Sequence, residues 1–248
     1  MTNEKTISSS LNRKYAVNEA FFDLLDADSA YVLGYIWTDG CVEMFGKDRK
    51  TGSWGILLEC SLKDREILDN IKKMMKTESP VRTRSRVLSY GKKIEMAKLC
   101  IYSNRLVEAL MKYGIIERKS KADPIPIGIP EEFKLDFIRG VLDGDGSLGR
   151  ETRNPSLFRL TFTGKQSLLR WVDQVLVGRL GVKPRKLYRS YPTKLTRSEC
   201  WVIVYSRQGD IQKIMDALHN GSCLFLARKS FAKSVANDFK ESVVSNAA

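Results

Sequence analysis

The chain has 248 residues, of which 43% are hydrophobic and 29% are charged, a balance that excludes a wholly disordered or fibrous chain. Its 42 Lys and Arg residues outnumber its 29 Asp and Glu residues, so the formal net charge is +13, which favours nucleic acid as a partner. No uncharged stretch approaches the roughly 20 apolar residues that span a bilayer, so no membrane partner is expected.

The N-terminal segment, the cysteines and the single histidine narrow the possibilities further. Residues 1–10 are polar and lack the apolar core of a signal peptide, so we expect the protein to act in the compartment in which it is made. The five cysteines have no metal-ligand spacing and are expected to be reduced. With His219 as its only histidine, the chain cannot use zinc-finger or other histidine-dependent nuclease chemistry.

Two similar segments, residues 31–40 and 137–146, organise the chain. Gly34 aligns with Gly140 and Asp39 with Asp145, at a constant offset of 106 residues. Solenoid repeats have units of roughly 20 to 50 residues, so a repeat this long indicates two duplicated half-domains.

The residues after each segment predict the order strand, strand, helix, strand, strand, helix. In the first half the predicted strands are 41–46, 54–62, 81–90 and 94–103, and the predicted helices are 63–76 and 104–113. In the second half the predicted strands are 146–150, 156–163, 182–191 and 199–206, and the predicted helices are 165–180 and 209–219. Alternation of apolar and polar residues, as in 158–163, is typical of a strand with one buried face.

Three prolines within residues 123–130 predict a stiff, extended linker between the halves. We therefore divide the chain into an N-terminal half-domain at 1–119, a linker at 120–130 and a C-terminal half-domain at 131–248. Residues 224–239 are predicted to form a terminal helix, followed by a frayed end at 242–248.

The two repeated segments are predicted to be buried helices. Residues 31–37 carry no charge, and residues 137–142 carry only Arg139, so both helices need apolar surroundings on nearly every side. Gly34 and Gly140 stand at equivalent positions and would let the helices approach backbone to backbone. Asp28 or Ser29 is predicted to cap the first of these helices.

Each predicted helix ends at an Asp-Gly pair. The negative end of the helix dipole disfavours a carboxylate there by a few tenths of a kcal/mol unless a cation compensates it. Two such ends side by side would place Asp39 near Asp145, and paired oxygen ligands favour Mg²⁺. A single Asp-Gly is more simply a turn into the next strand, but its duplication in matched halves favours a metal site.

Residues 32–40 and 138–146 resemble the nine-residue LAGLIDADG motif of homing endonucleases, and the resemblance covers nearly the whole chain. It implies an α+β fold of two pseudo-symmetric αββαββα half-domains. Their motif helices would pack at the interface, and their antiparallel sheets would form a DNA-binding saddle. The sequence departs from the motif at Trp37 and Arg139, two positions that tolerate variation.

The resemblance also implies a chemistry. Asp39 and Asp145 would be the catalytic, metal-binding acids, and the backbone carbonyls of Thr38 and Gly144 would complete the metal shell. The family hydrolyses phosphodiesters with Mg²⁺, for which Mn²⁺ can substitute, whereas Ca²⁺ supports binding without cleavage.

Two lysines are further candidates for catalysis. Lys63 and Lys165 are assigned to equivalent places at the end of the second strand of each half, where similar enzymes carry a lysine that organises water or transition-state charge. Both would also be unexceptional as exposed residues at a helix start, and both interpretations stay open.

Basic residues are expected on the DNA-facing surface. In the first half three arginines alternate along one predicted strand. In the second half the corresponding strand carries three candidate basic residues, and the loop after it carries two more. They are Arg82, Arg84, Arg86, Lys183, Arg185, Arg189, Lys194 and Arg197.

The preferred hypothesis is a monomeric, intron-encoded endonuclease. It would make a double-strand break with short 3′ overhangs in a long, asymmetric site in double-stranded DNA, with one motif aspartate per strand. An alternative on the same scaffold is an RNA maturase, with intron RNA as its partner, or a DNA-binding protein that does not cleave. A third alternative is a basic interaction domain without nucleic acid. The presence of both acids favours the endonuclease.

Overall fold

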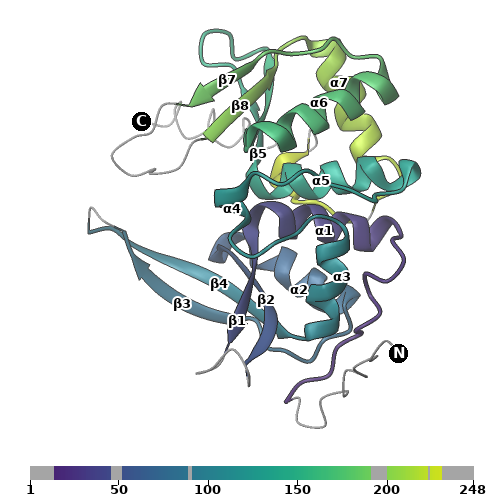
Figure 1. Ribbon diagram of the computed structural model, residues 1–248. Helices are drawn as coiled ribbons and strands as arrows, with labels where there is room; N and C mark the ends of the chain where they lie inside the picture. The colour runs from purple at the N-terminus through teal and green to yellow at the C-terminus, as the bar shows by residue number, and fades with distance from the viewer. Residues whose placement is uncertain (1–13, 46–51, 89–90, 191–199, 223, 231–248) are drawn as a thin grey trace, which may run out of the picture.

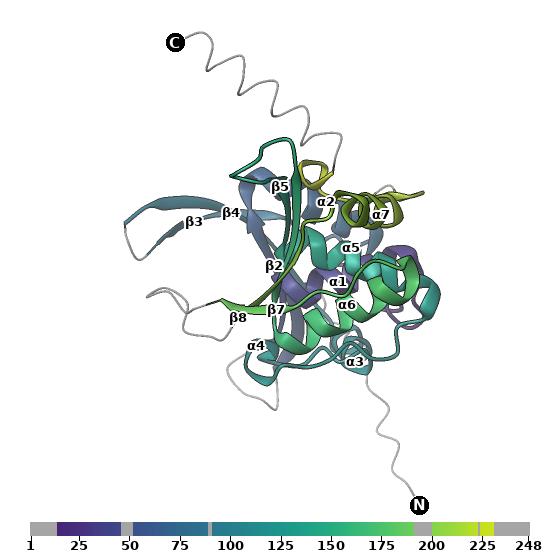
Figure 2. The ribbon, with the colours of Figure 1, turned by 90° about the horizontal axis from the view of Figure 1, so that it is seen from above.

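The computed structural model describes residues 14–45, 52–88, 91–190, 200–222 and 224–230. Two four-stranded antiparallel sheets, one from each half of the sequence, lie on either side of a central pair of helices (Figure 1). The helices of each half gather on one face of its sheet, and the other faces of both sheets are open on the same side of the molecule (Figures 1 and 2).

The first half supplies the lower layer in Figure 1, and its sheet has the strand order β1-β2-β4-β3. Its elements are α1 (Ala27–Asp39), β1 (Gly40–Phe45), β2 (Ser53–Ser61), the 3₁₀ turn η1 (Leu62–Asp64), α2 (Arg65–Met74), β3 (Arg82–Val87), β4 (Lys93–Tyr102) and α3 (Asn104–Lys112). A single helical turn, α4 (Lys119–Ala122), and an extended segment at 123–130 connect it to the second half.

The second half repeats this design with the strand order β5-β6-β8-β7. Its elements are η2 (Glu131–Phe133), α5 (Lys134–Asp145), β5 (Gly146–Arg150), β6 (Phe158–Gly164), α6 (Gln166–Leu180), β7 (Leu187–Ser190), β8 (Cys200–Tyr205), α7 (Gln208–His219) and η3 (Ala227–Lys229). The predicted fold class and the predicted order of elements are confirmed.

Two predicted elements differ clearly from the structure. The strand expected at 182–191 is only Leu187–Ser190, because Val182 packs into the core and Pro184 has no N–H for a strand ladder. Residues 224–230 form a loop with one 3₁₀ turn instead of the start of a terminal helix. The rest of that predicted helix, 231–239, and the predicted frayed end at 242–248 lie outside the described residues.

The cap of α1 is Asp26, and neither Asp28 nor Ser29 fills that role. The Asp26 carboxylate accepts the Ser29 backbone N–H at 2.7 Å, and the Ser29 hydroxyl accepts the Asp26 N–H at 2.8 Å. This reciprocal capping box satisfies two backbone donors at once, which a cap at either later residue would not do. Asp28 lies in the first turn, where its negative charge is favourable to the helix dipole.

The central contact between the halves is the close approach of α1 and α5. A Cβ atom added at Gly34 would lie 2.0 Å from the Phe137 carbonyl oxygen, and one added at Gly140 would lie 2.1 Å from the Tyr31 carbonyl oxygen. Only glycine allows this separation at either position. Around the crossing, the rings of Trp37 and Phe137 pack edge to face with their centroids 5.7 Å apart.

The apolar surface of α1 and α5 is almost entirely buried. Residues 29–37 of α1 and 137–143 of α5 are buried, including the charged Arg139. The Arg139 guanidinium donates to Asp136 at 2.7 Å and to the Leu218 carbonyl at 3.1 Å, which compensates its burial. No helix among the described residues is long and apolar enough to cross a membrane.

Candidate functional site

Two carboxylates meet where the central helices end. Asp39 is the last residue of α1 and Asp145 is the last residue of α5, and the chain turns from each directly into the first strand of a sheet. Because the two helices pack side by side from Gly34 and Gly140 onward, their C-terminal ends converge. The site therefore lies between the two sheets.

The pKa of the Asp39 carboxyl shows how the two acids act on each other. Burial and, to a smaller extent, the negative charge of Asp145 raise this pKa to about 6, although two lysines and the Tyr35 hydroxyl oppose the shift. The Asp145 residue is exposed, but neighbouring protein atoms exclude water from one side of its carboxyl, and this desolvation raises the pKa of that group. The two carboxylates repel each other across the helix interface.

Lys229 is buried beside these carboxylates. Its ammonium group donates to three carbonyl oxygens in the last turn of α5, those of Leu142 at 2.8 Å, Asp143 at 2.6 Å and Gly144 at 3.1 Å. Helix-terminal carbonyls have no partner inside the helix, so Lys229 caps α5 with a positive charge. Burial lowers the pKa of the Lys229 ammonium group to about 8, although Asp143, Asp39 and Asp145 oppose that shift.

The segment that carries Lys229 is fastened to both halves. The backbone N–H of Leu226 donates to the buried Asp143 carboxylate at 2.8 Å, and the Tyr31 hydroxyl of α1 donates to the same oxygen at 2.8 Å. Arg228 then makes two parallel hydrogen bonds to Asp64 in η1, at 2.8 and 2.9 Å. Residues 226–229 therefore join the end of the second half to the first half at the site.

Lys119 approaches the same carboxylates from the first half. It begins the one-turn helix α4, and its ammonium group donates to the Gly40 carbonyl, directly after Asp39. The flanking residues Arg118 and Asp123 have φ angles of 55° and 52°, a left-handed conformation that is uncommon for side chains of this size. Burial lowers the pKa of the Lys119 ammonium group, while its interactions with Cys41 and the two acids oppose that shift.

Neither lysine was identified from the sequence, although a signal was present. The tripeptide Arg-Lys-Ser occurs at 118–120 and again at 228–230, shortly after the last long helix described in each half. A match of three residues is too short to indicate a function by itself. The structure shows that the lysines of both copies lie beside the same two carboxylates. The predicted burial of the central helices offered no information about which later segments would reach their ends.

Lys63 and Lys165 are not structurally equivalent. Gly40 pairs with Leu58 in the first sheet and the equivalent Gly146 pairs with Phe162 in the second, so β2 and β6 correspond at an offset of 104 residues. Lys165 then corresponds to Ser61, because the β5–β6 hairpin is two residues shorter than the β1–β2 hairpin. The lysine charges that shift the Asp39 and Asp145 pKa values are those of Lys119 and Lys229, and Lys63 is exposed in η1.

The donors at the site fit a hard divalent cation. The charge of Asp145 raises the pKa of Asp39, so a cation would offset the negative charge of the pair, and oxygen donors are the ligands that Mg²⁺ and Ca²⁺ prefer. The Thr38 carbonyl lies in the last turn of α1, where helix carbonyls have no intrahelical partner. The Gly144 carbonyl already accepts a hydrogen bond from Lys229 and has one lone pair left. Among the described residues, no cluster of three or more His, Cys, Asp or Glu side chains forms a metal site.

The predicted basic surface of the first half lies on β3. Arg82, Arg84 and Arg86 are all exposed, and their alternation puts them on one side of the strand. Arg84 also forms an ion pair at 2.6 Å with Glu59 on the same sheet. This face of the first sheet is therefore charged but partly neutralised by its own carboxylates.

The predicted basic surface of the second half is smaller than expected. Arg185 precedes β7 and is half-buried, since its guanidinium pairs with Asp210 at 3.2 Å and lies over the Tyr205 ring. Lys183 is exposed before the strand and Arg189 is exposed within it. Lys194 and Arg197 lie outside the described residues.

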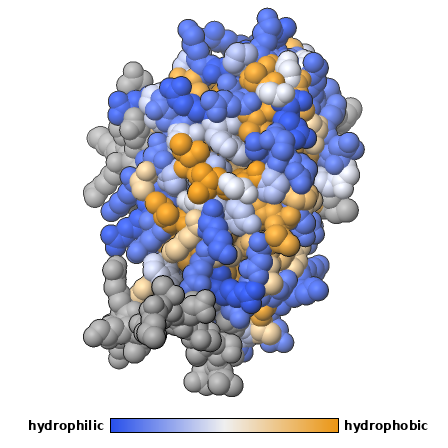
Figure 3. Space-filling view, turned by 45° about the vertical axis from the view of Figure 1, so that its right-hand side comes forward, coloured by the Kyte–Doolittle hydropathy of each residue, from blue (hydrophilic) through white to orange (hydrophobic). Residues whose placement is uncertain are grey.

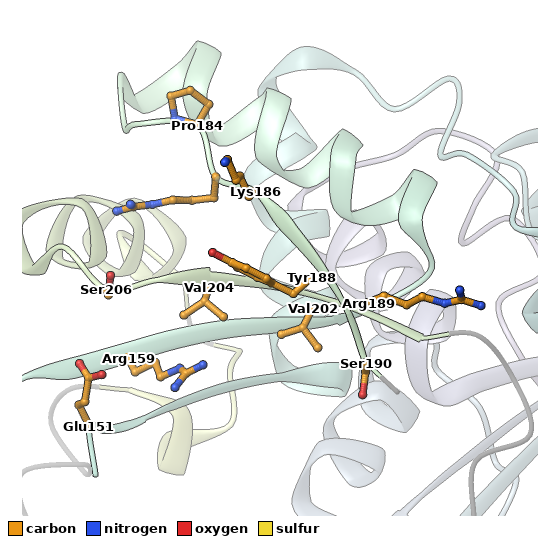
Figure 4. Close-up of a pocket in the computed structure, with 11 residues that line it drawn as sticks. Glu151, Arg159, Pro184, Lys186, Tyr188, Arg189, Ser190, Val202, Val204 and Ser206 are labelled. Atoms are coloured by element: carbon orange, nitrogen blue, oxygen red, sulfur yellow. The ribbon is translucent and has the colours of Figure 1, made fainter. Parts of the chain in front are cut away.

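The face of the second sheet contains a shallow hollow of about 690 Å³ (Figure 4). Val202 and Val204 project from β8 into it, and Tyr188 and Arg159 lie on either side of them (Figure 4). On another side of the molecule, hydrophilic residues cover most of the surface and hydrophobic ones gather in patches near the middle (Figure 3). The hollow on the second sheet therefore combines two valines with charged residues, among them Arg159, Lys186 and Glu151.

No family model matches the chain, and no curated protein matches its sequence. Solved structures do match its fold. The homing endonuclease I-WcaI bound to its DNA recognition sequence aligns with 85% of this chain and 89% of its own, with a TM-score of 0.58 and 10% identity. A variant of I-DmoI in complex with its target DNA and Mg aligns with 83% and 100%, with a TM-score of 0.53 and 16% identity.

The LAGLIDADG meganuclease I-AabMI bound to uncleaved DNA is a third such structure, covering 87% of this chain and 92% of its own, with a TM-score of 0.51 and 12% identity. Other complexes of I-DmoI with DNA contain Mn or Ca. At these identities the likeness concerns the fold, so the chain has the fold of LAGLIDADG homing endonucleases.

Proposed function

We propose that the chain is a LAGLIDADG homing endonuclease that makes a metal-dependent double-strand break at a long, asymmetric DNA site. The observation that carries this proposal is the convergence of Asp39 and Asp145 at the ends of two helices packed through glycine, with a lysine from each half beside them. A scaffold that needed only a turn at each Asp-Gly would have no reason to bring two repelling carboxylates together.

The DNA would lie along the open faces of the two sheets, which face the same side of the molecule (Figure 2). The net charge of +13 and the arginines of β3 favour phosphate contacts along this surface. The neighbours bound to DNA support double-stranded DNA as the partner. The helix ends, midway between the sheets, would then face the two scissile phosphates.

The cofactor we propose is Mg²⁺, with Mn²⁺ as a substitute and Ca²⁺ as a cation that permits binding without cleavage. Asp39, Asp145 and the carbonyls of Thr38 and Gly144 would hold it. When bound, the cation activates water and stabilises the charge on the reacting phosphate. I-DmoI complexes with Mg, Mn and Ca support a divalent cation on this fold.

The residues of this chain contribute orientation and positive charge. Lys229 and Lys119 are held beside the acids by backbone carbonyls, so each can stabilise negative charge that develops on a phosphate. The Tyr35 hydroxyl, which bonds to Asp39, keeps that carboxylate oriented. We assign the basic role near the phosphates to Lys119 and Lys229 instead of Lys63 and Lys165.

One chain supplies both acids and both lysines, so we propose that a monomer is sufficient for activity. We keep the half-domains at 1–119 and 131–248 and the linker at 120–130. The linker contributes directly to the site in this scheme, because α4, which starts at Lys119, overlaps its first residues.

The first test is a screen of a randomised duplex library with Mg²⁺, run beside the Asp145→Asn variant and with Ca²⁺. Selected, Mg²⁺-dependent cuts that the variant does not make would support the endonuclease. Cuts that survive in both Asp39→Asn and Asp145→Asn would contradict the assignment of the acids. Selective binding without any cut would instead support a DNA-binding protein or an RNA maturase.

Lys63→Met serves as a matched control for Lys119→Met, because both lysines belong to the first half and only Lys119 contacts the site. We expect Lys119→Met to slow cleavage by about 10²-fold and Lys63→Met to have little effect. An equal loss of cleavage rate in the two variants would support a catalytic role for Lys63.

A further inference from the structure

The strand pairing of the two sheets allows a position-by-position comparison of their open faces. Glu59 pairs with Lys98, and Lys98 pairs with Arg82, so these three side chains form a row across β2, β4 and β3. In the second sheet the corresponding row, at an offset of 104 residues on β6 and β8, is Thr163, Val202 and Tyr188. A row of three charged residues in one half is thus a row of three uncharged residues in the other.

The next row is uncharged in both sheets. Leu57 pairs with Cys100 in the first sheet, and Thr161 pairs with Val204 in the second. Val202 and Val204 are both half-buried, and alternate residues of β8, Ile203 and Tyr205, point into the core. The two valines therefore belong to the open face, where they lie side by side in the hollow (Figure 4).

We propose that Val202 and Val204 form a thymine-recognising patch, which contacts the C5-methyl groups of thymines in the major groove of one half-site. This inference rests on the proposed function, because it requires DNA along the sheet. It adds that the two halves recognise different base chemistry, and that the half-site under the second sheet is rich in thymine where β8 crosses it.

The chemistry of the major groove supports this assignment. Thymine is the one base that presents a methyl group there, and apolar side chains are its natural contacts. Valine offers no donor or acceptor to the polar edges of the other bases, so it would leave them without a partner. The first sheet, with Lys98 and Arg82 at the equivalent positions, is suited to the guanine acceptors O6 and N7.

The residues around the patch fit a polyanion and not an apolar ligand. Arg159 and Lys186 also line the hollow, and both are exposed. They can hold the phosphates on either side of a groove while the valines contact the bases between them. The exposed ring of Tyr188, at 60% accessibility, extends the apolar surface toward the edge of the sheet.

The test begins with duplexes enriched from a randomised library by the full chain in Ca²⁺. Each thymine of the enriched site is then replaced, one at a time, by deoxyuridine, which lacks only the methyl group and still pairs with adenine. We expect Kd to rise about fourfold for each methyl group that the patch buries. These thymines should cluster in one half-site.

Two variants locate the effect on the protein. Val204→Ser should remove the difference in Kd between thymine and deoxyuridine at one position, whereas Cys100→Ser, which introduces serine at the equivalent position of the first sheet, should leave that difference unchanged. Val202→Lys, which copies Lys98, should change the base enriched beneath β8 from thymine to guanine. Circular dichroism checks that each variant is folded. The ratio of Kd for the deoxyuridine duplex to Kd for the thymine duplex does not change when a variant binds both duplexes more weakly by the same factor.

The outcomes separate the inference from the function on which it rests. An enriched site at which no thymine can be distinguished from deoxyuridine would overturn the patch and leave the endonuclease intact. The patch would also be overturned if the methyl effect persisted in both valine variants. A library from which nothing is enriched would overturn the proposed function and the patch together.

Discussion

Lys119 and Lys229 bring the same charge to the same pair of carboxylates, but the two halves hold them differently. Lys229 is 3% exposed and bonds to three carbonyls, in a segment fastened by Asp143 and Arg228. Lys119 is only half-buried and bonds to one carbonyl, from a single helical turn. The two halves therefore place a lysine beside the same carboxylates but support it with different contacts. The same substitution at Lys119 and at Lys229 should have unequal effects on stability.

The largest effect is expected where the halves are most alike, at the helix crossing. Gly140→Ala places a Cβ about 2.1 Å from the Tyr31 carbonyl oxygen, and Gly34→Ala makes a similar clash from the other side. Each should lower the free energy of unfolding by about 3 kcal/mol or more. Gly178→Ala, at a helical position with no atom within 4 Å, is the control and should be neutral or stabilising. Chemical denaturation measures all three, and a tolerated Gly34→Ala would disprove the contact.

The next effect separates the two lysines. Lys229→Met leaves three carbonyls of α5 without their donor and should cost about 2 kcal/mol of stability, because unsatisfied buried acceptors are expensive. Lys119→Met, with one carbonyl at stake, should cost about 1 kcal/mol or less. Denaturation in the absence of metal measures both. Equal losses would show that the difference in support has no energetic consequence.

Substitution of a site carboxylate should raise the stability of the metal-free protein, whereas the substitutions above lower it. The folded pKa of Asp39 is about 6, above its ordinary value of 3.8, so the folded state loses stability as pH rises from about 4 through 6. Asp39→Asn removes this penalty and should stabilise the metal-free protein at pH 8 by about 1–2 kcal/mol, allowing for partial solvent access. The gain should disappear below pH 4. Thermal melts across pH measure it, and a less stable Asn variant at pH 8 would contradict the raised pKa.

The smallest effect compares the two arginines that precede these lysines. Arg228→Gln breaks the paired hydrogen bonds to Asp64 and should cost about 1 kcal/mol. Arg118→Gln disturbs only an exposed contact with Glu117 at 3.8 Å and should change stability by less than about 0.5 kcal/mol. Urea titration of the two variants resolves the difference. A larger loss for Arg118 would mean that α4 is the better supported segment.

Much of this architecture could be predicted from the sequence because its signals are local or repeated. The order of strands and helices follows from periodicity, and the buried central helices follow from uncharged runs that contain glycines in register. The duplication made Asp39 and Asp145 candidates, since neither Asp-Gly pair alone distinguishes a site from a turn. These predictions required no knowledge of contacts across the fold.

The parts that were missed depend on partners far away in the sequence. Lys229 acquires its role from carbonyls about 85 residues earlier, and Arg185 turns inward because Asp210 and Tyr205 happen to lie beside it. A two-residue difference between hairpins displaced the expected match of Lys63 with Lys165. The cap at Asp26 was missed for a local reason, since three neighbouring residues could each have served.

The contact of Arg228 with Asp64 joins residues 164 positions apart, and Lys229 follows it directly. During synthesis the first half, with its carboxylate and its own lysine, emerges from the ribosome long before residues 226–229 exist. Until then α5 lacks the positive charge at its end, and the buried Asp143 lacks the Leu226 N–H that it accepts. For the endonuclease proposed above, the site would therefore be complete only after both halves have been made and docked.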